Sequence, residues 1–324
     1  MTTAGLIEKA AGGLPRAATD APRARAIAPE QIFDVDFDAL AACGLFAPGE
    51  RASALALELR AVKRRLLRRI GFLRAGGGPG VARRSGRQRN LILVASTRPG
   101  EGKTFTAINL ALSFAHEDGI DVLLVDADTP RPKVMSHFGL NAGARGLLDR
   151  LADPALSVDG LMVKARGAGL SILPEGRPDA GAAAELYASE EAKRFFTEIS
   201  SHQPDRLVII DSPPVLASAD AVLLARHVDE VVFVVEADAT PEPAVAAAVD
   251  ELLDVNPNVS LLLNRCLIGG GGSHYGSYKD YYPEERRRNA CPPRPRGRSD
   301  LDLRAVARGG PGAADKGGGD GRDR

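Results

Sequence analysis

The stretch LILVASTRPGEGKTFTAINLALSF, residues 91–114, decides the fold of this chain. An apolar run leads into a Gly- and Pro-containing loop, and a helical apolar pattern begins after Gly102-Lys103-Thr104. Phosphates are bound by backbone N–H groups aimed at one point, and glycines let a loop curl that closely ahead of a helix N-terminus. Lys103 can then reach the β- and γ-phosphates, and the Thr104 hydroxyl can bind Mg²⁺. The stretch therefore predicts a strand, a phosphate-binding loop and a helix.

Short apolar runs alternate with helical patterns throughout residues 88–268, which we expect to form one globular domain. Continuous apolar strands that alternate with helices indicate an α/β fold with a mostly parallel sheet flanked by helices. The expected strands are 91–96, 122–126, 170–173, 207–211, 231–235 and 260–264, and the expected helices are 102–116, 182–200, 217–226 and 242–254.

Three aspartates stand at the ends of two predicted strands: Asp126 and Asp128 after VLLV, and Asp211 after LVII. Because the carboxyl ends of parallel strands meet at one edge of a sheet, we expect these carboxylates to converge beside the phosphate loop. Magnesium needs only one or two carboxylates, which leaves one aspartate to accept a proton from an incoming hydroxyl. Taken singly, each aspartate is equally consistent with a helix cap or a salt bridge.

The last predicted strand ends in Asn264 and Arg265. Asn264 is a candidate for reading the edge of a purine base, with Arg265 stacking on the base or flanking it. The competing interpretation is a polar strand end beside solvent.

The formal net charge is zero, which argues against a general nucleic-acid-binding role, yet the charge is unevenly distributed. Residues 51–74 predict an amphipathic helix with a dense Arg/Lys face, suited to a subunit interface or to anionic lipid headgroups. We expect residues 1–50 to be mostly flexible and the Gly-, Arg- and Pro-rich residues 269–324 to be disordered. No apolar run approaches the length of a membrane span.

Tyrosine is scarce and clustered. The chain has five Tyr and no Trp. Four of the five lie close together after a run of glycines, at Tyr275, Tyr278, Tyr281 and Tyr282. Such a cluster is consistent with a set of modification sites or with a sticky low-complexity tail.

Together these motifs resemble the bacterial tyrosine kinases, the P-loop autokinases of polysaccharide export. PGEGKT (99–104), VLLVDAD…RP (122–132) and LVIIDSPP (207–214) stand in order, and LLLN (261–264) and the Tyr-rich end follow. GLIEKA (5–10) and RAVKRRLLRR (60–69) are similar to the soluble branch encoded beside exosortase (PEP-CTERM) and exopolysaccharide genes. The resemblance implies a MinD-like (SIMIBI) P-loop NTPase fold that uses ATP and Mg²⁺.

The same resemblance implies a role for each site residue. Thr104, Asp128 and Asp211 would serve the metal, Asp126 would be the base for a tyrosine hydroxyl, and Arg131 would lie near the phosphate or a subunit contact. The remaining expected nucleotide contacts are Pro99, Gly100, Glu101, Gly102, Lys103, Phe105, Asn264 and Arg265. The four clustered tyrosines would be phosphorylated in trans within a homo-oligomeric ring.

The implied partners are a separate membrane polysaccharide co-polymerase (chain-length determinant) and a cognate tyrosine phosphatase. The protein would be cytoplasmic and recruited by a partner to the inner face of the plasma membrane. Two departures stand out: Leu57 occupies the position of a family glutamate in the subunit-contact helix, and Thr97 replaces the first glycine of the strict phosphate-loop pattern.

Two rival functions stay open at this point. A MinD/ParA-like switch ATPase would carry a signature lysine where this chain has Arg98, and its tail would lack the tyrosines. A non-catalytic, ATP-bound scaffold of the polysaccharide machinery would carry the same nucleotide motifs.

Overall fold

The computed structural model describes residues 31–48, 53–71, 89–141, 143–177, 182–203 and 205–266. The predicted phosphoacceptor tail at 269–324, with its four tyrosines, lies outside the described residues, as does the GLIEKA segment at 5–10.

One eight-stranded sheet organises the described residues, in the order β1-β4-β5-β3-β6-β2-β7-β8. Every neighbouring pair is parallel except β4 and β5. The strands are β1 (Gln31–Phe33), β2 (Leu91–Ser96), β3 (Asp121–Asp126), β4 (Val163–Ala165), β5 (Leu170–Leu173), β6 (Arg206–Asp211), β7 (Glu230–Glu236) and β8 (Val259–Asn264). The predicted mostly parallel α/β sheet is therefore confirmed.

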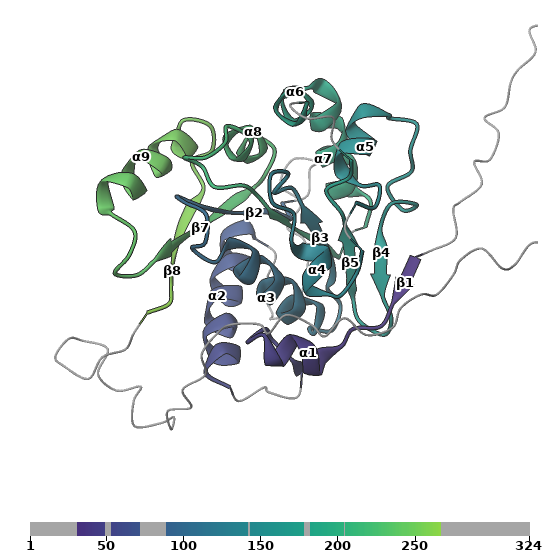
Figure 1. Cartoon of the computed structure of the whole chain (residues 1–324), viewed down its shortest axis with the longest axis horizontal. Helices are drawn as coiled ribbons and strands as arrows, with labels where there is room; N and C mark the ends of the chain where they lie inside the picture. Colours follow the sequence, from purple (N-terminus) through teal and green to yellow (C-terminus); the bar gives the residue numbers. More distant parts are fainter. Residues whose placement is uncertain are drawn as a thin grey trace, which may run out of the picture. The chain divides into compact units, whose positions relative to one another are not determined.

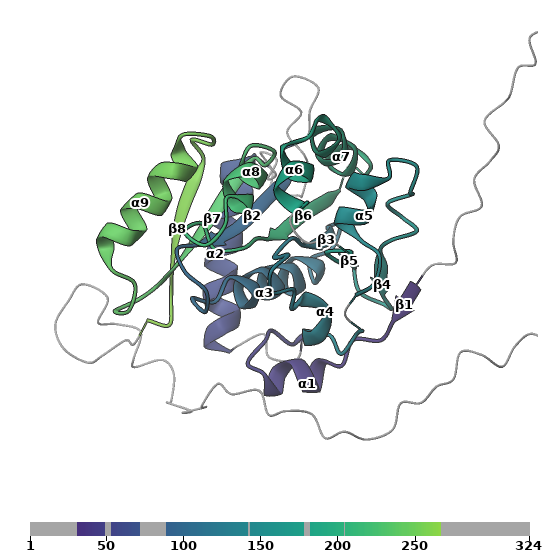
Figure 2. The ribbon, with the colours of Figure 1, turned by 45° about the horizontal axis from the view of Figure 1, so that its top comes forward.

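Helices cover both faces of this sheet (Figures 1 and 2). One face packs against α1 (Phe37–Ala42), α2 (Ala54–Ile70), α3 (Lys103–Ala115) and α4 (Val134–His137). The other face packs against α5 (Leu147–Ala152), α6 (Ala183–Ala188), α7 (Glu190–Ser201), α8 (Asp220–Ala225) and α9 (Glu242–Leu253).

The alternation of side chains along the strands explains why two apolar layers form. In β2, Ile92 and Val94 belong to the layer beneath α2 and α3, whereas Leu91 and Leu93 belong to the layer on the opposite face. A strand with helices on both sides buries every side chain, so its sequence is a continuous apolar run. This burial holds β2 rigid, and the phosphate loop follows directly from it.

Two expectations about helices and flexible segments were wrong. Residues 31–48, inside the segment expected to be flexible, form β1 and α1, and Leu40 is 2% exposed. The backbone N–H of Phe46 also donates to Asn109 Oδ1 on α3, at 2.7 Å. The helix expected at 182–200 is broken at Ser189, which has an extended backbone and caps α7 by accepting from the Ala192 N–H.

The predicted basic helix forms as α2 and is an integral part of the domain. Ser53 caps its start, and Gly71 ends it in a left-handed conformation. Its apolar side packs beside α3, where the ammonium of Lys63 donates to the Ser113 carbonyl at 2.8 Å and pairs with Glu117 at 2.6 Å. Among the helices in the described ranges, none combines the length and apolarity needed to cross a bilayer.

Candidate functional site

The phosphate loop joins β2 to α3 and turns on two glycines. Gly100 and Gly102 have φ angles of +92° and +99°, a region that side chains disfavour. A Cβ at Gly102 would also lie 2.1 Å from Asn264 Nδ2, whereas a Cβ at Gly100 would meet nothing within 4 Å. Because α3 begins at Lys103, its first backbone N–H groups face the loop and form an anion-binding site.

Glu101 supports the loop from inside. Its side chain is buried and accepts from the Arg98 backbone N–H at 2.8 Å and from the Thr240 hydroxyl at 2.7 Å. The Glu101 carbonyl accepts from Asn264 Nδ2 at 2.9 Å. The loop is thus fastened to β8 and to the segment after β7, so the Glu101 side chain positions the loop and does not point at a ligand.

Lys103 and the three predicted aspartates lie at the carboxyl edge of the sheet. The register of β3 and β6 pairs Asp126 with Asp211 as direct neighbours. Lys103 Nζ is 3.9 Å from Asp128 Oδ2, and both side chains are largely buried. Sequence spacing and the parallel sheet therefore bring these residues together as expected.

Asp211 is the least satisfied group at this edge. It is 0% exposed, and neither carboxylate oxygen has a hydrogen-bond partner among the described residues. Burial raises the pKa of Asp211 to about 7, although the nearby Thr104 hydroxyl and Lys103 ammonium act to lower it. A buried carboxylate without a donor is costly, and this cost would be offset by a cation bound there.

The donor set fits Mg²⁺. Thr104, Asp128 and Asp211 offer hard oxygen atoms, and magnesium keeps several waters and takes few protein ligands. Within the ranges that the structure describes, no three His, Cys, Asp or Glu side chains form a metal-binding group. The site thus suits an ion held partly by waters and substrate phosphates, and does not form an all-protein cage.

Asp126 is tied into the backbone. Its Oδ1 accepts from the Asp128 N–H at 3.2 Å, and its Oδ2 accepts from the N–H groups of Lys133 and Val134 at 3.1 and 3.0 Å. Burial, followed by the charge of Asp211, raises the pKa of Asp126 well above its ordinary value, and the backbone N–H groups partly oppose that rise. The contacts of Asp126 are thus those of a residue that caps backbone N–H groups, including the one at the start of α4. Its raised pKa also suits proton transfer.

Asp128 has a different environment. Burial raises its pKa, and the positive charge of Lys103 is the largest opposing effect. Its side chain keeps a tenth of its surface exposed. Asp128 can therefore meet a ligand that approaches from solvent.

Several residues predicted for the nucleotide site make other contacts or are exposed. The Phe105 ring packs against the apolar layer beneath α2. Arg131 is exposed on the loop after β3, and its positive charge acts on Asp128. The exposed Arg265 pairs with Glu236 at 2.6 Å. Asn264 is at the site, but its amide N–H₂ holds the loop.

Two residues at the site were not found from the sequence. Thr240 holds Glu101 through its hydroxyl. The exposed Lys133 contributes positive charge to both Asp128 and Asp211. Thr240 has no local motif that would mark it, whereas Lys133 directly follows the Arg131-Pro132 pair and could have been considered.

Comparison with known proteins identifies the family of this chain. Residues 89–264 match the family model described as an AAA domain. The chain is 33% identical over 195 residues to the tyrosine-protein kinase YwqD of Bacillus subtilis (strain 168), covering 60% of this chain and 78% of that protein. It is 27% identical over 211 residues to the tyrosine-protein kinase CpsD of Streptococcus agalactiae, covering 63% and 86%.

A solved structure gives the same picture. The VpsO kinase domain superposes with a TM-score of 0.51 at 29% identity, covering 55% of this chain and 86% of that domain. Residues 89–264, which match the AAA-domain model, contain the phosphate loop, the aspartates of β3 and β6, and the end of β8. The chain therefore belongs to the bacterial tyrosine kinase family of P-loop proteins.

Proposed function

We propose that this protein is an ATP- and Mg²⁺-dependent tyrosine autokinase that phosphorylates Tyr275, Tyr278, Tyr281 and Tyr282 of its own tail. The observation that carries the proposal is the buried, unpartnered carboxylate of Asp211 beside Lys103 and Thr104. Positive charge is needed there, and the Mg²⁺ that accompanies a triphosphate substrate would supply it.

In the proposed reaction, a tyrosine oxygen forms a bond to the γ-phosphorus of ATP. The bond from that phosphorus to the β–γ bridging oxygen breaks, ADP leaves, and the hydroxyl proton passes to a carboxylate. The first N–H groups of α3 and the Lys103 ammonium hold the phosphates in line. Thr104, Asp128 and Asp211 would hold Mg²⁺, which would supply positive charge to neutralise the phosphates.

Asp126 is the proposed proton acceptor. A carboxylate offers about four lone-pair sites, and three of them are occupied by backbone N–H groups. The remaining site and the raised pKa suit a general base. The same contacts make Asp126 an anchor of the loop that carries Asp128, so its replacement has to be tested for both roles.

The cellular role follows from the family. We propose that the protein regulates exopolysaccharide synthesis or export, acts in trans within a homo-oligomeric ring, and is recruited to the membrane by a separate co-polymerase subunit. A cognate phosphatase would reset the tail. The exposed arginine face of α2 supports a subunit or partner contact.

The test is phosphate mapping by mass spectrometry after incubation of the purified full chain with Mg²⁺ and ATP. We expect phosphotyrosine on the tail of the wild type and none in Lys103→Met or in a variant with all four tyrosines changed to Phe. Lys193→Met, at an exposed surface lysine of α7, is the matched control and should behave as the wild type.

Two outcomes would refute the proposal. ATP hydrolysis to phosphate without tail phosphorylation would favour the switch ATPase. Tight ATP binding with neither hydrolysis nor phosphorylation would favour the scaffold.

A further inference from the structure

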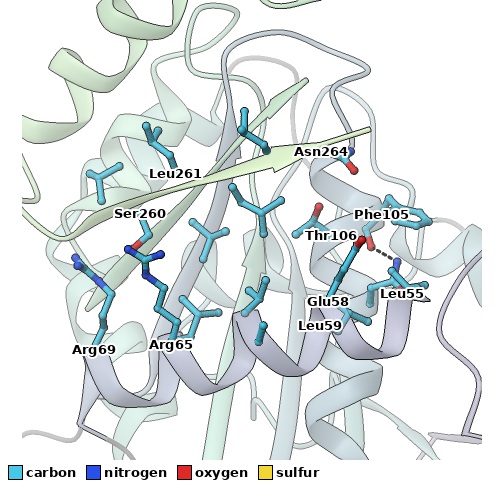
Figure 3. Close-up of a pocket in the computed structure, with 18 residues that line it drawn as sticks. Leu55, Glu58, Leu59, Arg65, Arg69, Phe105, Thr106, Ser260, Leu261 and Asn264 are labelled. Carbon is cyan, nitrogen blue, oxygen red and sulfur yellow. Dashed lines mark hydrogen bonds between the residues drawn. The ribbon is translucent and has the colours of Figure 1, made fainter. Parts of the chain in front are cut away.

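An open groove runs between helix α2 and edge strand β8, and one of its ends lies beside the phosphate loop at Asn264. Its volume is about 790 Å³, which is within the usual range for binding sites. The wall on α2 and the floor on the sheet are mostly apolar, with Leu59, Val62, Leu66, Val232 and Leu262 among the lining residues. Figure 3 shows the groove open between the strand and the helix.

The two ends of the groove differ in charge. At one end, Arg65 and Arg69 rise from α2 towards Ser260 on β8 (Figure 3). Arg69 pairs with the buried Glu230 at 2.6 Å. Arg65 is exposed and pairs with no acid among the described residues. This end therefore presents a positive charge to a ligand in the groove.

The other end of the groove is where β8 finishes. Asn264 and Phe105 lie there (Figure 3), with Glu58 on the α2 side. Glu58 is itself an exposed acid, so a second negative charge is disfavoured at this end. The chain leaves the sheet at this point, and 58 residues follow the last described residue, Cys266.

We propose that this groove binds the chain's own tail, residues 275–280, running antiparallel to β8. Glycines 269–272 permit the sharp reversal that such a path needs. The strand covers roughly 17 Å from Val259 to Asn264 at about 3.3 Å per residue, and five or six extended tail residues span the same length. Because side chains alternate along an extended segment, Tyr278 and Asp280 share one face of the tail, and Tyr278 then lies over the apolar lining.

One charge of the tail matches that path, because the extended backbone turns Asp280 to the opposite face from its neighbour Lys279. Asp280 reaches the Arg65 end, and Tyr281 and Tyr282 follow it. Phosphorylation of either tyrosine adds roughly −1.5 to −2 charges and strengthens the pairing with arginine. Docking would hold the acceptor tyrosines along α2, away from the phosphate loop, and would keep a phosphorylated tail out of neighbouring active sites.

Docking itself goes beyond the proposed function, and only its strengthening by phosphate rests on that function. The test places the photo-crosslinking residue p-benzoylphenylalanine at Tyr278 in the full chain, without ATP. Light and ¹⁵N-labelled chains are mixed before irradiation. We expect crosslinks to peptides of α2 or β8, with both halves carrying the same isotope label.

Charge variants sharpen the test. Arg65→Glu should lower the crosslink yield about three-fold, because one ion pair becomes a repulsion. Arg64→Glu, also exposed and next to Arg65 on α2, is the matched control and should not change it. Adding Asp280→Arg to Arg65→Glu should restore the yield. Melting curves check that each variant is folded.

Other outcomes overturn the proposal. Crosslinks that combine both isotope labels would assign the groove to a second copy. The absence of crosslinks to α2 or β8, or equal loss in both arginine variants, would show that the tail does not bind there. If the wild-type chain forms the expected crosslinks but shows no kinase activity, the docking proposal stands and only the proposed function is refuted. A lower yield after tail phosphorylation would refute the phosphate-strengthened step.

Discussion

Gly102 lies close to Asn264, so substitutions at these two positions measure how much the contact between the phosphate loop and β8 contributes to stability. Alanine at position 102 would have to keep a φ of +99°, which costs about 2 kcal/mol for a residue with a side chain. Its Cβ would lie 2.1 Å from Asn264 Nδ2 and would expel that amide, whose hydrogen bond to the Glu101 carbonyl is worth about 1 kcal/mol. Gly102→Ala should therefore lower the free energy of unfolding by about 3 kcal/mol.

A double-mutant cycle separates the two contributions. Asn264→Ala removes only the hydrogen bond and should cost about 1 kcal/mol. If Gly102→Ala acts partly by expelling Asn264, the double variant should cost about 3 kcal/mol, about 1 kcal/mol less than the sum of the single changes. Urea unfolding followed by circular dichroism, in the absence of nucleotide, measures all four chains.

Gly100→Ala is the matched control. Its φ of +92° carries the same backbone cost, but its Cβ would meet nothing within 4 Å. It should cost about 2 kcal/mol and should be additive with Asn264→Ala. Additive costs for Gly102→Ala and Asn264→Ala would refute the reasoning, as would equal coupling in both glycine variants.

Three further predictions concern the acids of the site. Asp211→Asn should abolish tail phosphorylation and yet stabilise the nucleotide-free chain by about 2 kcal/mol at pH 8. Removal of the buried charge stabilises the chain by about 4 kcal/mol, and a buried amide without a hydrogen-bond partner destabilises it by about 2 kcal/mol. Because the folded pKa of about 7 lies above the ordinary 3.8, wild-type stability should fall from about pH 4 to pH 7, and this part of the slope should vanish in Asp211→Asn; an unchanged slope in urea titrations would contradict the pKa. Thr240→Val should weaken ATP binding several-fold by calorimetry because Glu101 loses a hydrogen bond, whereas Thr197→Val, on the exposed side of α7, should not. Asp126→Asn should leave ATP affinity within about three-fold and lower the phosphorylation rate at least 100-fold; an equal loss of both would assign Asp126 to loop anchoring alone.

The sequence predicted those parts of the fold that depend on local pattern. The six strands expected from the sequence are mostly apolar runs, and all six form within a residue of their expected limits. β1 and β4 are three residues each, too short to produce a pattern, and they exist because neighbouring strands offer them edges to pair with. The break at Ser189 was readable in principle, since a serine followed by two glutamates is typical of a helix start.

The site divides in the same way. The phosphate loop and its aspartates follow from motif and topology, so Lys103, Asp128 and Asp211 meet as predicted. The role of Asn264 does not follow from them, because its partner Glu101 is 163 residues away and the contact is made only when β8 joins the sheet. The Glu101 side chain likewise turns inward, where the Thr240 hydroxyl donates a hydrogen bond to it, and the sequence of the loop does not predict this contact.

The packing of the N-terminal segment onto α3 also constrains the order of folding during synthesis. Residues 31–70 leave the ribosome before α3 does, and they carry residues that become buried, such as Leu40 and Ile70, whose partners lie later in the chain. The hydrogen bond of Phe46 needs Asn109, which is 63 residues later, and the ion pair of Lys63 needs Glu117, which is 54 residues later. Because such long loops must close before these contacts form, α2 and its apolar face stay uncovered until the helix of the phosphate loop is complete. The nascent chain is therefore most exposed to aggregation and to chaperones just before its nucleotide site appears.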